Sequence, residues 1–173
     1  MRKKPVALRR KILLPRPDSS PHTRPITVHL FYSPHPRHSL SKDPLIALSS
    51  ERNLIFDVPG GGFISMGPEH HEERLRSWAV KTCRPVISIE YGKAPECKLS
   101  HRSSPSPMPL NMPSTDPYPF AIDEVFDAYR IIIESKGKAI GIGVAGKDLN
   151  IVLSGDSACV RMFSAEEHLL TLT

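Results

Sequence analysis

Residues 149–159 read Leu-Asn-Ile-Val-Leu-Ser-Gly-Asp-Ser-Ala-Cys, and this stretch decides the fold. Its apolar run, residues 151–153, indicates a strand, and it enters a turn of small residues with Ser157 at the apex. Small neighbours suit a strained turn, because the backbone can come close only where side chains are minimal. The pattern is typical of a nucleophile elbow, a sharp strand-to-helix turn that holds a serine hydroxyl at the edge of a sheet. Cys159 stands where that motif has a glycine.

A glycine-rich loop lies upstream of this stretch. Residues 53–58 (NLIFDV) predict a short strand, which runs into Pro59 and then Gly60, Gly61 and Gly62. Consecutive glycines leave the backbone N–H groups unobstructed, so that they can face inward. Such donors can stabilise an oxyanion, although a flexible turn is an equally good interpretation of the glycines alone.

The elements between the loop and the elbow alternate between helix and strand. Residues 69–83 predict an amphipathic helix, residues 86–91 (VISIEY) a β-branched strand, and residues 117–137 a second amphipathic helix that stops at Gly137. Residues 97–116 are rich in Ser and Pro without periodicity, so we expect a disordered insert there. Strands joined by such long crossovers demand a parallel α/β sheet.

The first 25 residues are basic and rich in proline, and we expect them to form a leader outside the folded domain. Lys and Arg dominate before the first acidic residue, Asp18, and the formal net charge of the chain is +5. A solvated leader is the favoured interpretation; the alternatives are a tail that binds nucleic acid or an anionic membrane, and an organellar targeting segment. Residues 26–32 (ITVHLFY) predict a strand, in which we expect His29 to be exposed.

Several patterns that would indicate other functions are absent or misplaced in the sequence. No apolar run approaches the ~20 residues that span a bilayer, and no secretory signal is present. The three cysteines lack zinc spacing, and adjacent residues of a helix, such as EHHEE (69–73), cannot converge on one ion, so we expect no metal and no other cofactor. GIGVAG (141–146) matches a dinucleotide fingerprint but precedes a strand instead of following one. We therefore expect a chain of a reducing compartment, the cytoplasm, with no nucleic-acid partner and no particular oligomeric state indicated.

Five segments, in this order, resemble the hormone-sensitive-lipase-like branch of the α/β-hydrolase fold. They are FDVPGGGF (56–63), HEERLRSWA (71–79), PVISIEYGKAPE (85–96), PYPFAIDEVFDAY (117–129) and LSGDSA (153–158). The resemblance implies a partial α/β-hydrolase over residues 26–158, a parallel three-layer sandwich lacking its C-terminal half. It also implies an enzyme that hydrolyses small-molecule or lipid carboxylic esters through an acyl-serine.

The same resemblance assigns roles to individual residues. Ser157 matches the nucleophile, and the amides of Gly61, Gly62 and Ala158 match the oxyanion hole. Asp156 matches a structural residue of the elbow, and Pro59 replaces the histidine of the family's glycine loop.

The end of the chain departs from the family pattern. The tail, residues 159–173, does not resemble the helix that follows the elbow, and the family's triad Asp and His come well downstream of the serine. His168 is the only histidine after Ser157, and along a helix it would lie ~16 Å away. We therefore expect a truncated chain that is inactive for lack of a base; the alternative is a non-catalytic hydrolase domain that acts as an interaction module, or an unstable gene product.

Overall fold

The computed structural model describes residues 5–35, 43–62, 65–93, 120–143 and 148–157. The expected insert at 97–116, the tail at 159–173 and the oxyanion-hole residue Ala158 lie outside these ranges, as does His168.

Within the described residues, one mixed sheet of five strands in the order β1-β2-β4-β3-β5 forms the centre of the structure. The strands are β1 (Leu8–Leu14), β2 (Ile26–Tyr32), β3 (Asn53–Val58), β4 (Val86–Glu90) and β5 (Asn150–Gly155). β3 pairs parallel to both β4 and β5, as the helical crossovers predicted. β2 runs antiparallel to both β1 and β4, so the expected parallel sheet is mixed on that side. Nothing forces those strands to be parallel, because the chain joins β1 to β2 without a helical crossover.

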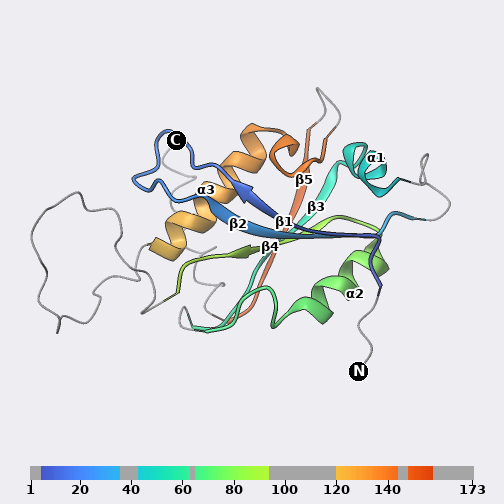
Figure 1. Cartoon of the computed structure of the whole chain (residues 1–173), viewed down its shortest axis with the longest axis horizontal. Helices are drawn as coiled ribbons and strands as arrows, with labels where there is room; N and C mark the ends of the chain where they lie inside the picture. Colours follow the sequence, from blue (N-terminus) through green and yellow to red (C-terminus); the bar gives the residue numbers. More distant parts are fainter. Residues whose placement is uncertain (1–4, 36–42, 63–64, 94–119, 144–147, 158–173) are drawn as a thin grey trace, which may run out of the picture.

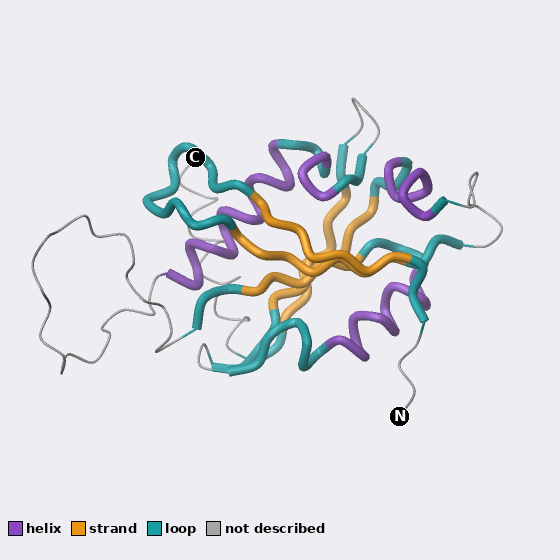
Figure 2. Tube along the Cα trace, viewed as in Figure 1, coloured by secondary structure: helices purple, strands orange, loops and turns teal. Residues whose placement is uncertain are grey.

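Helices cover both faces of the sheet and complete three layers (Figure 1). α3 (Phe120–Glu134) packs on the face that holds the larger core, whose sheet residues include Leu30, Phe56 and Ile87. α2 (Glu72–Thr82) lies on the other face, over a smaller cluster that includes Phe31 and Val86. Figure 2 shows the same arrangement, with helical segments on either side of the twisted strands. Two short elements, α1 (Pro44–Ser49) and the 3-10 helix η1 (Lys138–Ile140), complete the described structure.

Within the described segments, no helix combines the length and the apolar character that crossing a membrane requires.

The predicted solvated leader is wrong for residues 8–14, which form β1. This strand pairs along its whole length with β2, and Leu14 at its end is fully buried. Leu8 and Ile12 lie on the same face and pack against the core, while Arg9, Arg10 and Lys11 are exposed. Charged side chains protect an edge strand from pairing with other chains. Three of the basic residues that suggested a leader, Arg9, Arg10 and Lys11, therefore belong to the outer edge of the sheet.

The expected exposure of His29 is also wrong, since only 5% of this residue is exposed. β2 is an interior strand with β1 on one side and β4 on the other. The ring of His29 faces Glu90, with 3.1 Å between Nε2 and Oε2. The missed strand β1 is the reason for the error, because without it β2 would be an edge.

The C-terminus of α2 offers a direct test of backbone strain. Cys83 caps the helix in the left-handed conformation, with φ 54° and ψ 33°, which a Cβ atom disfavours. We expect Cys83→Gly to raise the free energy of unfolding by about 0.5–1 kcal/mol, measured by urea denaturation. Cys83→Ala is the matched control, because it removes the same thiol but keeps the Cβ atom. An equal gain in both variants would show that the thiol, and not the backbone, is responsible.

Candidate active site

The glycine loop and the elbow meet at one edge of the sheet. β3 and β5 are parallel neighbours in a register that pairs Val58 with Gly155, so the segments that follow them leave the sheet side by side. This is the carboxyl edge of the parallel strands, where open α/β sheets bind their ligands. Ser157 lies there in a turn directly after β5, exposed and at φ 58°. A serine held in the left-handed region is strained, as expected for an elbow.

Asp156 ties the glycine loop to the elbow. Its Oδ1 accepts a hydrogen bond of 2.7 Å from the backbone N–H of Gly60. A Cβ atom on Gly60 would lie 2.6 Å from that carboxylate oxygen and 2.9 Å from the Asp156 carbonyl oxygen, so only glycine fits. Gly61 and Gly62 follow with φ of 130° and 62°, conformations that glycine adopts freely. The structure therefore brings Gly61, Gly62 and Ser157 to the same edge.

An arginine that the sequence did not point to, Arg74, fixes the position of Asp156 relative to β3. Arg74, in the first turn of α2, donates from Nη1 to Asp156 at 3.0 Å and from Nη2 to Asp57 at 3.1 Å. Asp57, on β3, is fully buried and accepts a second hydrogen bond from the Ser88 hydroxyl at 2.8 Å. The guanidinium also lies over the ring of Trp78, 5.0 Å from its centroid. One cation thus links β3, the glycine loop and the elbow.

The pKa values of the two carboxyl groups in this cluster, Asp57 and Asp156, are shifted in opposite directions. Burial raises the pKa of Asp57, against the opposing effects of Ser88 and Arg74. Partial burial also acts to raise the pKa of Asp156, but the donors from Arg74 and Gly60 outweigh it and hold that pKa below its usual range. Asp156 is therefore ionised near neutral pH and keeps its hold on the loop. The signal that could have revealed the cluster is Asp57 itself, a charged residue inside an apolar strand that requires a cation.

No described histidine is hydrogen-bonded to the Ser157 hydroxyl. His70 is held within its own turn, where its Nδ1 accepts from the N–H of Gly67 at 3.1 Å. His71 stands at the start of α2 near Asp57 and Asp156, and its buried Nε2 has no partner in the described part of the chain. The described ranges therefore place a serine and a glycine loop at the same edge of the sheet, with no described histidine bonded to the serine.

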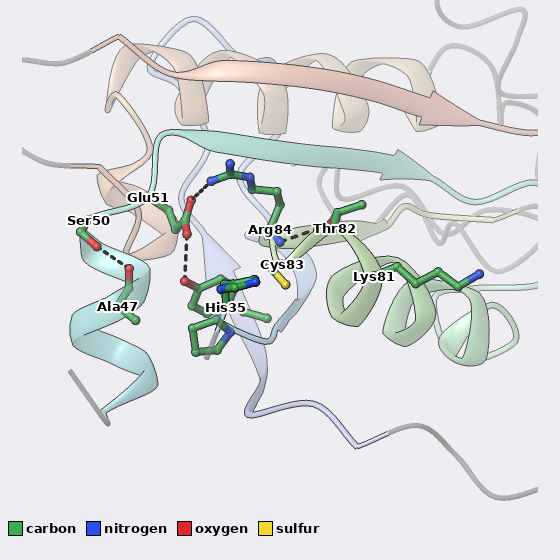
Figure 3. A pocket seen from close by; sticks show the side chains of 10 residues that line it. His35, Ala47, Ser50, Glu51, Lys81, Thr82, Cys83 and Arg84 are labelled. Carbon is green, nitrogen blue, oxygen red and sulfur yellow. Dashed lines mark hydrogen bonds and ion pairs between the residues drawn. The ribbon is translucent and has the colours of Figure 1, made fainter. Parts of the chain in front are cut away.

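A cavity of about 470 Å³ lies at the opposite edge of the sheet (Figure 3). Part of its polar lining is paired, since Glu51 accepts from the Tyr32 hydroxyl at 3.0 Å and from Arg84 at 2.9 Å. Cys83 contributes a free thiol to the wall. Because this cavity adjoins the amino ends of β3 and β4, it is separate from the candidate active site.

The architecture of the described residues is that of part of an α/β-hydrolase, and solved structures agree. An arylesterase superposes with a TM-score of 0.63 at 19% identity, covering 98% of this chain and 42% of its own. A hyperthermophilic esterase from the archaeon Pyrobaculum calidifontis gives a TM-score of 0.62 at 19% identity, covering 95% of this chain and 41% of its own. These likenesses show the fold.

The sequence relatives are more specific. Hormone-sensitive lipase of Homo sapiens is 36% identical over 107 residues, which are 62% of this chain and 8% of the relative. Hormone-sensitive lipase of Ictidomys tridecemlineatus is 34% identical over 110 residues, 64% of this chain and 11% of the relative. An esterase of Acinetobacter venetianus is 31% identical over 111 residues, 64% of this chain and 27% of the relative. No family model matches the chain. The resemblance to the hormone-sensitive-lipase-like branch is confirmed, and the chain spans between 8% and 27% of the length of these relatives.

Proposed function

We propose that this chain carries the nucleophile and the oxyanion donors of a carboxylic-ester hydrolase. The observation that carries the proposal is the placement of Ser157, in a left-handed turn at the carboxyl edge of β5, beside a glycine loop fixed through the Gly60–Asp156 hydrogen bond. The esterases and lipases among its relatives support the same chemistry.

In this proposal the Ser157 oxygen attacks the carbonyl carbon of a small-molecule or lipid ester. The amides of Gly61, Gly62 and Ala158 donate to the oxyanion that develops, and each such donor typically contributes about 10²–10³ in rate. The acyl group passes to the serine and the alcohol leaves, after which water releases the acid. Each proton transfer needs a base against the serine, and no described imidazole is hydrogen-bonded to Ser157. Without one the hydroxyl stays protonated and weakly nucleophilic, so we propose that the 173-residue chain by itself does not turn over esters.

A second candidate function is a non-catalytic interaction module. It is favoured by the outer edge of β5, which pairs only with β3 among the described strands. Val152 and Leu153 on this strand are 63% and 41% exposed. An open strand edge with exposed apolar side chains can pair with another chain. The free thiol of Cys83 supports a reducing compartment, the cytoplasm, for either candidate.

Two readouts on the full chain and on its Ser157→Ala variant decide between the candidates. Hydrolysis of a p-nitrophenyl ester should be equally slow in both proteins; turnover that depends on Ser157 would contradict the proposed inactivity. Binding of phenylboronic acid, which forms a tetrahedral adduct with a serine oxygen and imitates the transition state, should be detectable by calorimetry and lost in Ser157→Ala. Equal boronate binding by both proteins, together with no Ser157-dependent turnover, would contradict the proposed hydrolase site and favour the interaction module.

A further inference from the structure

Three segments of the chain bring an imidazole and two carboxylates together, and none of these side chains belongs to the glycine loop or to the turn at Ser157. His29 lies on β2, Glu90 ends the neighbouring strand β4, and Glu69 lies in the turn before α2. The Nε2 atom of His29 is 3.1 Å from Glu90 Oε2 and 3.5 Å from Glu69 Oε1. One ligand atom from each residue lies within 4.8 Å of the other two.

The two separations from His29 Nε2 match those between ligands on one tetrahedral ion. Bonds of about 2.0–2.1 Å to zinc place neighbouring donor atoms ~3.3 Å apart. The two His29 distances, 3.1 and 3.5 Å, lie on either side of that value. The combination of one imidazole with two carboxylates suits zinc and similar first-row ions, whereas magnesium and calcium prefer oxygen ligands alone.

The ligands are positioned before any ion arrives. The ring of His29 is buried, and β2 and β4 fix it relative to Glu90 through a continuous antiparallel register. Glu69 is held by the turn in which the N–H of His70 donates to the Gly67 carbonyl at 3.0 Å, while the N–H of Gly67 donates to the His70 ring. The Glu69 side chain is half exposed, which leaves an open side toward solvent.

Lysines now balance the charge of the carboxylates. Lys11 on β1 lies directly opposite His29, and its Nζ is 2.8 Å from the same Oε2 atom of Glu90 that faces the imidazole. Lys93 lies on the Glu69 side of the cluster. A Cβ atom placed on Gly67 would be 2.9 Å from Glu69 Oε2 and 3.0 Å from Lys93 Nζ. An incoming cation would compete with these ammonium groups, and Lys11 is exposed enough to swing away into solvent.

We propose that His29 Nε2, Glu69 and Glu90 form a site for zinc or a closely similar divalent ion, with a fourth coordination position open to water. Three protein ligands and one open position are the arrangement of zinc sites that hold a water or a substrate as the fourth ligand. The ion would tie the turn before α2 to β2 and β4. This inference does not rest on ester hydrolysis, because none of its ligands belongs to the serine and glycine-loop arrangement.

Zinc titration by calorimetry on the full chain, produced without a histidine tag and cleared of metal, tests the proposal. We expect one ion per chain and a higher melting temperature in its presence. Glu69→Gln should weaken binding at least about tenfold, since even outer partners of a metal site contribute that much. Glu69 is half exposed, so this variant should keep its fold, which circular dichroism would verify. Lys11→Met should bind zinc several-fold more tightly than wild type, because it removes the competing ammonium.

The matched control is His22→Asn. His22 also faces a carboxylate, with 3.2 Å between its Nε2 and Asp123 Oδ2, but it belongs to no three-ligand group in the described ranges. Its variant should bind zinc like wild type, and magnesium should not compete in any of the proteins. Unchanged zinc affinity in folded Glu69→Gln, or no binding by wild type at millimolar zinc, would overturn the site.

Discussion

Replacing Arg16 with methionine is expected to destabilise the fold by about 3–5 kcal/mol, the cost of removing one partner from a buried ion pair. The Arg16 side chain is only 4% exposed, and its two terminal nitrogens donate to Glu124 at 2.6 Å and to Asp127 at 2.9 Å. Both carboxylates lie on α3 and are buried. Methionine fills similar space but removes the nearest cation from both acids, leaving Glu124 with only the more distant Arg24 at 4.0 Å among the described residues. It also removes two of the hydrogen bonds between the segment after β1 and α3.

The loss should depend on pH. Burial raises the pKa of Glu124, although its donors, Arg16 among them, oppose the shift. A carboxyl whose pKa is raised by folding binds protons more readily in the folded state, so its contribution to stability falls as the pH rises above its unfolded value of about 4.3. Without Arg16 the pKa rises further. The difference between variant and wild type should therefore be larger at pH 7 than at pH 5, measured by urea denaturation.

Arg130→Met is the matched control for this experiment. Arg130 is a residue of α3 itself, and it forms an exposed i, i+4 pair with Glu134 at 2.9 Å. Such pairs contribute about 0.3–0.5 kcal/mol. Equal losses in the Arg16 and Arg130 variants would contradict the assignment of Arg16 as a buried clamp.

Arg74→Met should have the second largest effect, a loss of about 3 kcal/mol in unfolding free energy together with release of the glycine loop. Among the described residues, the variant leaves the buried Asp57 with only the Ser88 hydroxyl as a hydrogen-bond partner, and it frees Asp156 from α2. Asp156 would then hold Gly60 less firmly. Faster hydrogen exchange of the Gly60 amide is the local readout, and thermal unfolding is the global one.

A double variant separates these two consequences. Adding Asp57→Asn to Arg74→Met replaces the uncompensated charge by a neutral amide that can still bond to Ser88, so part of the stability should return. The Gly60 amide should still exchange quickly, because the link to Asp156 is not restored. If the double variant were no more stable than Arg74→Met, the buried charge of Asp57 would not be the cause of the loss.

Most of the interior elements could be predicted from periodicity. The strands at 26–32 and 53–58 have the predicted bounds, and Gly137 follows α3 in the left-handed conformation, as predicted for its C-terminal stop. β1 was missed because its exposed face carries Arg9 and Lys11 and because prolines surround it. An edge strand needs only one apolar face, and the half-buried Leu8 and Ile12 give a weak signal.

The sequence by itself determined the elbow at Ser157 and the glycine loop at 60–62. Both are set by local backbone demands, namely small side chains and positive φ, which leave a mark on a few consecutive residues. Only the tertiary structure decided which charges meet: Arg16 with Glu124, Arg74 with Asp57 and Asp156, and His29 with Glu69 and Glu90. The physical reason is that a buried charge is stabilised by whatever the fold places beside it, and those partners come from strands and helices far apart in the chain.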